Sequence, residues 1–172
     1  MEGSRRWWGL SAVALVAHNL EEHLRMGAFL DSREAMPPLA QKMMEGLTVA
    51  QFDVSLVIAT LLVLALAIVA TRSKPHSVGM GVGLGFGVGA GMLLNALQHT
   101  VSSLYFGALS PGVVTGWLLL VPVGIAFTAR ALSREWITPR EFLAYTALGA
   151  LVTALSLPAM HAFSAVVLRA VS

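Results

Sequence analysis

The hydrophobic positions of the chain gather into long runs, and the charged positions gather into the short segments between them. No Asp, Glu, Lys or Arg occurs between Asp53 and Arg72, or between Lys74 and Arg130. About 20 apolar residues in a helix cross the hydrocarbon core of a bilayer. The pattern predicts an all-α membrane protein, a single-domain bundle of about five transmembrane helices within residues 1–172, at about 7–26, 49–71, 77–106, 113–131 and 141–167.

The third of these segments alternates glycine with apolar residues, at every odd position from Gly79 to Gly91. Alternation with a period of two is typical of a strand. An isolated strand in lipid would leave its backbone groups unsatisfied, so we predict a helix instead. Its glycines then form overlapping Gly-xxx-Gly pairs, which let neighbouring helices approach closely.

Two shorter signals complete the outline of the bundle. Residues 27–48 are polar, yet their apolar positions recur at helical spacing, which predicts a short interfacial helix there. Pro122 and Pro158 fall inside the fourth and fifth predicted helices and predict a kink in each.

The composition narrows the possible functions. Hydrophobic residues make up 56% of the chain and charged residues only 12%, against about 25% charged in soluble domains. The net charge of +2 is too small to favour a nucleic-acid partner. The chain has no cysteine, which excludes disulfides and thiolate sites, so any metal would need His, Asp, Glu or Asn as ligands.

Basic residues set the expected orientation. Seven Lys and Arg residues fall on the side of the N-terminus and four on the other side. By the positive-inside rule we expect a cytoplasmic N-terminus, anchored by Arg5 and Arg6, with Trp7 and Trp8 at the interface. We expect an integral protein of a bacterial inner membrane.

Polar residues of four predicted helices fall at one depth. His18, Glu21, Glu22 and Arg25 share one stripe of the first helix, whereas His23 points away from it. An ionisable group at the bilayer centre costs roughly 2.5–3.5 kcal/mol and is a functional candidate by default. The candidate catalytic groups are Glu21, Glu22, Arg25 and Asp53, and the candidate metal ligands are His18, Glu22, Asn95, His99 and His161.

Three stretches carry a resemblance to a known family. His18-Asn-Leu-Glu21-Glu22, the later Asn95-Ala-Leu-Gln-His99 and the turn Ser110-Pro111-Gly112-Val-Val-Thr occur in this order. Together they resemble a family of uncharacterised membrane proteins named for its HXXEE motif, over roughly residues 10 to 125. The family has a tyrosine where Leu109 stands here. The resemblance implies a site but no established activity.

The leading hypothesis is a metal-dependent membrane enzyme. Imidazole and carboxylate ligands suit Zn²⁺ or non-haem Fe²⁺, with His18, Glu22 and His99 as ligands and Glu21 or Asp53 as a fourth ligand or base. The metal would neutralise the paired carboxylates and activate a water for hydrolysis. The expected partners are membrane lipid and a hydrophobic small-molecule substrate that enters laterally.

Four alternatives stay open. One is metal-free acid–base isomerisation of a sterol or terpenoid, by analogy of architecture with the emopamil-binding sterol isomerases. Another is a protease similar to the CAAX-type endopeptidases, although Arg25 lies one residue too close to the glutamates for their motif. A small transporter, which would need a homo-oligomer, is the third. The fourth is a structural polar knot that ties the helices together.

Overall fold

The computed structural model describes the backbone of residues 2–171 and the side chains of residues 5–42, 44–155 and 162–169. All regular structure in this part of the chain is helical. The long segments are α1 (Glu2–Asp31), α3 (Val49–Arg72), the continuous run α4 (Val78–Val82), η2 (Gly83–Leu94) and α5 (Asn95–Phe106), the continuous run α6 (Val113–Thr115), η3 (Gly116–Leu120) and α7 (Val121–Ser133), and α8 (Pro139–Val171). Two short helices, η1 (Ser32–Ala35) and α2 (Pro38–Met43), connect α1 to α3.

The five predicted helices therefore exist, and each lies within a few residues of its predicted bounds except α1, which is longer at both ends. Three helical stretches are long and apolar enough to cross a membrane, namely 49–72, 78–106 and 113–133. The helix α1 contains several charged residues, and the side chains of residues 156–161 in α8 are not described. Five spans therefore remain a prediction.

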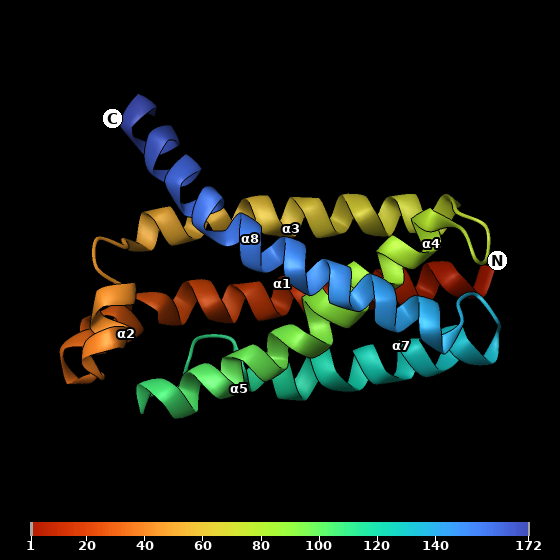
Figure 1. Cartoon of the computed structure of the whole chain (residues 1–172), viewed down its shortest axis with the longest axis horizontal. Helices are drawn as coiled ribbons and strands as arrows, with labels where there is room; N and C mark the ends of the chain where they lie inside the picture. Colours follow the sequence, from red (N-terminus) through yellow and green to blue (C-terminus); the bar gives the residue numbers. More distant parts are fainter. Residues whose placement is uncertain (1, 172) are drawn as a thin grey trace.

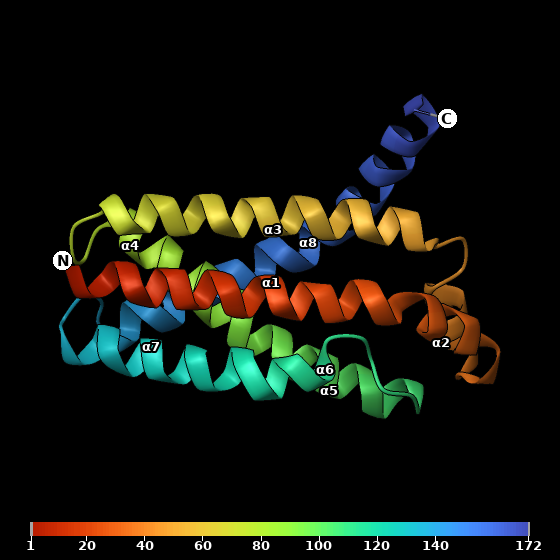
Figure 2. The same ribbon diagram turned by 180° about the vertical axis from the view of Figure 1, so that it is seen from behind.

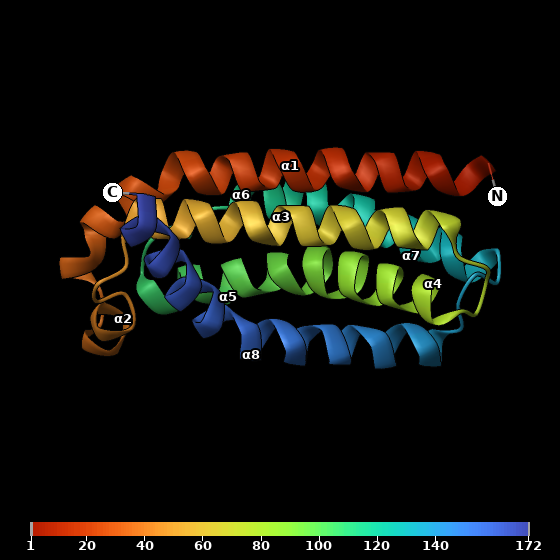
Figure 3. The same ribbon diagram turned by 90° about the horizontal axis from the view of Figure 1, so that it is seen from above.

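The glycine-rich helix occupies the centre of the bundle. Figure 2 shows α1 lying between α3 and α7, and Figure 3 shows α1 and α8 on opposite sides of the bundle. The run from α4 to α5 passes diagonally between them (Figure 1). The C-terminal third of α8 turns away from the other helices in the same view. Pro158 lies outside the described side chains, so its effect on this bend stays a prediction.

The alternating glycines face two different neighbours. A Cβ atom at Gly85 would lie 2.6 Å from the carbonyl carbon of Tyr145, and one at Gly89 would lie 2.9 Å from Cβ of Thr146, both on α8. Gly83 instead lies on the other face, where a Cβ would meet Cβ of Ala70 on α3 first and would lie 3.0 Å from the Trp8 ring of α1. Residues four apart share a face, so period two in sequence produces two faces of close helix packing. The predicted helix and its role are confirmed.

The helix is also wound more widely than expected. From Gly83 to Leu94 the backbone follows a π-helix, as it does from Gly116 to Leu120. A π segment is rare and needs support from its surroundings. Glycine has no Cβ to obstruct the neighbouring helices, which explains why the wide winding is accommodated here.

The two ends of the bundle have separate apolar clusters. At the N-terminal end Trp8 is buried and meets Phe127 edge-on, with ring centroids 4.7 Å apart. Trp8 therefore packs into the core of the bundle, and its predicted place at the membrane interface stays a prediction. At the other end Met26 and Phe29 of α1 pack with Met36, Ala40 and other apolar side chains of the η1–α2 segment, which forms the predicted short helix.

We predict that Gly85→Ala destabilises the protein, because the added methyl group meets the backbone of α8. Overpacking of this kind costs typically about 1–3 kcal/mol. Gly87→Ala is the matched control, since a Cβ there would lie 3.9 Å from Trp8 and touch nothing closer. Thermal unfolding in detergent should lower the midpoint for Gly85→Ala and leave that of Gly87→Ala equal or higher. Equal midpoints in the two variants would contradict the assigned packing.

Candidate metal centre

Three buried side chains from two helices meet in the half of the bundle nearest the C-terminal end of α1. His18 and Glu22 lie one turn apart on the buried face of α1, and α5 contributes His99. One ligand atom of each lies within 4.8 Å of the others. Residues four apart on a helix share a face, which explains why α1 alone supplies two of the three groups.

The Glu22 carboxylate lies between the two imidazoles. Its Oε1 atom is 2.8 Å from Nε2 of His99 and 3.7 Å from Nε2 of His18. Both histidines therefore turn the same ring nitrogen toward one carboxylate oxygen. The rings meet at an angle of 66° with centroids 5.1 Å apart.

A chain of hydrogen bonds fixes which nitrogen of His18 carries its proton. Glu21 accepts from the backbone N–H of Thr115 at 2.7 Å and from its hydroxyl at 2.6 Å, and it also accepts from Arg25 at 3.0 Å. The single hydroxyl proton of Thr115 is used in this way, so its oxygen accepts from Nδ1 of His18 at 3.1 Å. In a neutral imidazole Nε2 then presents a lone pair.

His99 has the corresponding arrangement. Its Nδ1 lies 3.1 Å from the hydroxyl oxygen of Ser110, whose own proton points to the Pro111 carbonyl at 3.4 Å. Nε2 of His99 is buried, and its nearest polar neighbour is Oε1 of Glu22 at 2.8 Å. The direction of this contact does not meet the geometry of a hydrogen bond. With the proton of each neutral ring on Nδ1, the two Nε2 atoms and a carboxylate oxygen converge as acceptors. Acceptors this close repel each other unless a proton or a cation lies between them.

The turn at Ser110-Pro111-Gly112 closes over this group. Gly112 has φ of +87°, and a Cβ atom there would lie 2.7 Å from Cε1 of His18 and 3.1 Å from Nε2 of His99. Only glycine fits this backbone conformation and this closeness at low cost. The turn therefore brings backbone against these side chains and keeps bulk water out.

Both π-helical segments border the site. The first, η2, ends at Leu94, directly before Asn95, and the second, η3, begins at Gly116, directly after Thr115. Departures from α geometry are common at functional sites. Asn95 uses its amide group to donate to Nε2 of His18 at 3.1 Å.

The structure does not bring every predicted residue to the site. Asp53 of α3 instead accepts a hydrogen bond from His23 at 2.8 Å. His23 lies on another face of α1 than His18 and Glu22, which agrees with its predicted direction. Arg25 is half-exposed at the rim, and it reaches the centre only through Glu21. The side chain of His161 lies outside the described residues.

Three contributors were not among the candidate site residues, namely Ser110, Gly112 and Thr115. Each lies in the stretch that carries the family resemblance, so the signal was present in the sequence. Their role depends on α6 meeting α1, which no local pattern of residues reveals.

A family model described as a protein of unknown function with HXXEE motif matches residues 8–127. This range contains His18, Glu22, His99 and the turn that covers them. No curated protein and no solved structure matches the chain.

We predict that Thr115→Val destabilises the protein by about 1–3 kcal/mol, because Nδ1–H of His18 is left buried without an acceptor. Valine keeps the shape of threonine, so the loss is mainly of hydrogen bonds. Thr71→Val is the control, since the Thr71 hydroxyl bonds only to its own helix at Ile68, and we expect a change within about 0.5 kcal/mol. Thermal unfolding in detergent compares the two, and equal midpoints would refute the assigned chain of bonds.

We predict that Gly112→Ala is more harmful than Gly107→Ala. Both glycines have positive φ, so both substitutions carry the left-handed penalty of about 1–2 kcal/mol. Only the Gly112 methyl group would meet His18, Glu22 and His99, since nothing lies within 4 Å of a Cβ at Gly107. The difference between the two unfolding midpoints measures the closeness of the turn to the site. A difference of zero would mean that the turn does not lie against these side chains.

Proposed function

Because the chain belongs to the family of proteins of unknown function with an HXXEE motif, its activity must be inferred from its site, and we propose a metal-dependent enzyme. In this proposal His18, Glu22 and His99 bind one divalent cation and the enzyme hydrolyses a lipid or lipid-linked substrate. The observation that supports this proposal is that one possible ligand atom from each of His18, Glu22 and His99 lies within 4.8 Å of the others, and that all three side chains are buried.

The donor set suggests the metal. Two imidazoles and one carboxylate are the ligands of several catalytic zinc sites and of the non-haem iron facial triad, and both leave positions open for water or substrate. Hydrogen bonds from the outer nitrogens of both histidines support this use, because metal-bound histidines almost always donate from the other ring nitrogen. Zn²⁺ or Fe²⁺ is the expected ion.

Other residues of the chain would support the centre. Thr115 and Ser110 hold the two rings in the ligating orientation, and Glu21 with Arg25 fixes the Thr115 hydroxyl. Glu21 is engaged in these bonds, so we assign it to positioning and not to proton transfer. The Asn95 amide already lies at Nε2 of His18, and with its oxygen turned inward it would supply a fourth ligand.

The chemistry would be addition of water to an ester or phosphoester. A bound cation lowers the pKa of water and polarises the substrate oxygen. The water oxygen forms the new bond to the acyl carbon or phosphorus, the bond to the alcohol oxygen breaks, and the alcohol takes up the proton that water gives. Three helices are long and apolar enough to cross a membrane, which favours a substrate that comes from the bilayer. We propose five spans with a cytoplasmic N-terminus.

A second candidate is metal-free acid–base catalysis on a terpenoid or sterol. The 2.8 Å separation of His99 Nε2 and Glu22 Oε1 favours it, because a single proton shared between these atoms would also relieve their repulsion. Bound metal distinguishes the two candidates.

We predict near-stoichiometric zinc or iron in the protein purified in mild detergent, measured by elemental analysis. His18→Ala, Glu22→Gln and His99→Ala should each lower the metal content at least tenfold, since each removes one ligand. The matched controls are His23→Ala and Asp53→Asn, which alter a second histidine–carboxylate pair on α1 and α3. These should keep the wild-type content.

Two outcomes would overturn the metal proposal. If the folded wild-type protein is free of metal after exposure to Zn²⁺ and Fe²⁺, acid–base catalysis and a structural polar cluster are the remaining explanations of the site. Equal loss of metal in the site variants and in the two controls would show that the ion binds somewhere else.

A further inference from the structure

The N-terminal end of the bundle carries a concentration of exposed basic side chains. Figures 1 and 3 show that the start of α1, the connection from α3 to α4 and the connection from α7 to α8 all lie at this end. The exposed basic residues of these three segments are Arg5, Arg6, Arg72, Lys74, Arg134 and Arg140. We propose that this surface binds the phosphate groups of anionic phospholipids. The inference does not depend on the proposed metal centre, which lies in the other half of the bundle.

Neighbouring acids do not neutralise these positive charges. Among the described residues, no salt bridge joins any of the six basic side chains to an acidic one. The acidic side chains that are described at this end are Glu135 and Glu141. Glu141 is already engaged, since its Oε2 atom accepts from the backbone N–H of Thr138 at 2.7 Å and lies 3.0 Å from Nδ1 of His76. The surface therefore keeps a net positive charge.

Two of the three basic segments are joined to each other. The backbone N–H of His76, in the connection from α3 to α4, donates to the Trp136 carbonyl in the connection from α7 to α8 at 2.9 Å. The contact of the His76 ring with Glu141 adds a second link between them. The arginines of both connections therefore belong to one surface. A guanidinium group binds a phosphate through two parallel N–H donors, which suits this surface to phosphate ligands.

The opposite end of the bundle has the reverse charge. Residues 21–53, which form most of that end, include six acidic and three basic residues. One of the three, Arg25, already pairs with Glu21 at 3.0 Å. Anionic ligands are therefore expected at the N-terminal end of the bundle and not at the other.

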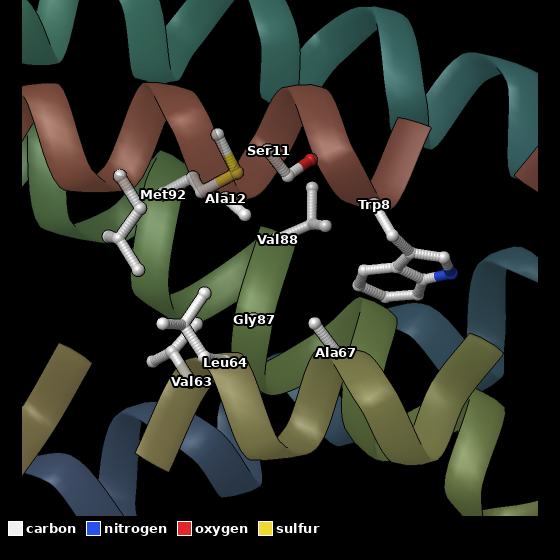
Figure 4. A pocket seen from close by; sticks show the side chains of 10 residues that line it. Trp8, Ser11, Ala12, Val63, Leu64, Ala67, Gly87, Val88 and Met92 are labelled. Carbon is white, nitrogen blue, oxygen red and sulfur yellow. The ribbon is translucent and has the colours of Figure 1, made fainter. Parts of the chain in front are cut away.

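The cavity between the helices in this half of the bundle is too small for a lipid headgroup. Figure 4 shows Trp8 of α1, Ala67 of α3 and Val88 of η2 around it, and its volume is about 20 Å³. A cavity needs roughly 10–15 Å³ to hold one water, so this one has room for about one. The proposed ligand therefore binds on the outer surface, where the six basic side chains lie.

The position of the basic residues along the chain favours a lipid over a soluble anion. Three helical stretches are long and apolar enough to cross a membrane, and one of them ends at Arg72 while another ends at Ser133, directly before Arg134. In a bilayer that these helices cross, both arginines lie at the level of the headgroup phosphates. Basic residues next to spanning segments are attracted to a leaflet that contains anionic lipids. Phosphatidylglycerol is a phospholipid with the required net negative charge.

The test uses the full chain in mild detergent and native mass spectrometry, which counts bound dioctanoyl phosphatidylglycerol and dioctanoyl phosphatidylcholine. The wild type should bind phosphatidylglycerol about fivefold more tightly or better, because only this headgroup has a net negative charge. Arg72→Gln combined with Arg134→Gln should remove this preference, and Arg72→Lys combined with Arg134→Lys should retain it because the charges remain. The matched control is Arg33→Gln combined with Lys42→Gln, which removes two exposed charges at the opposite end and should leave the preference unchanged.

Equal affinity of the wild type for the two lipids, or equal loss of the preference in the two glutamine double variants, would overturn the inference. Loss of the preference in the lysine double variant as well would refute the role of positive charge. Inorganic phosphate or polyglutamate that displaces phosphatidylglycerol at equal concentration would assign the surface to soluble anions or acidic proteins instead. The metal content is measured in the same samples and should be equal in all variants, so failure of this inference leaves the proposed metal centre unaffected.

Discussion

The close approach of the Glu22 carboxylate to Nε2 of both His18 and His99 is the constraint that orders the rest of the site. Nε2 of His99 lies 2.8 Å from Oε1 of Glu22, so a proton or a cation must lie between these two atoms. The surroundings enforce this arrangement through Thr115 and Ser110, which hold the outer ring nitrogens. With Nδ1 protonated on both rings, these bonds would direct the Nε2 lone pairs inward, which is the orientation that the proposed cation would require.

The same constraint accounts for the glutamate pair of the motif. Glu21 and Glu22 are adjacent in sequence, yet they have different tasks. Glu21 is satisfied by Thr115 and Arg25 and links α1 to α6, whereas Glu22 faces the two histidines. Two adjacent carboxylates on one helix are tolerated because Glu21 is paired with Arg25 and accepts two hydrogen bonds from Thr115.

Glycine has two separate uses in this fold. In η2 the alternating glycines let α1, α3 and α8 approach one wide helix, and this helix delivers Asn95 and His99 at its end. In the turn at residues 110–112 a single glycine with positive φ lets the backbone lie against the three site residues. The first use builds the scaffold and the second closes the site.

The sequence by itself determined the helices and half of the site. Charge-free runs predicted the helical segments with close bounds, because a backbone that crosses lipid would have few alternatives to helix. Helical spacing placed His18 and Glu22 on one face, and the depth of the polar residues pointed to His99. These are local properties of one helix, which a sequence records directly.

Only the tertiary structure decided the partners across helices. Asp53 and His99 both had suitable depth, but the rotation of α3 turns Asp53 to His23 while α5 turns His99 to Glu22. The π-helical winding, the burial of Trp8 and the closeness of Gly112 also depend on how neighbouring helices pack. Depth along a helix follows from counting residues, whereas rotation about its axis is set by contacts with other helices, and those contacts exist only in the assembled bundle.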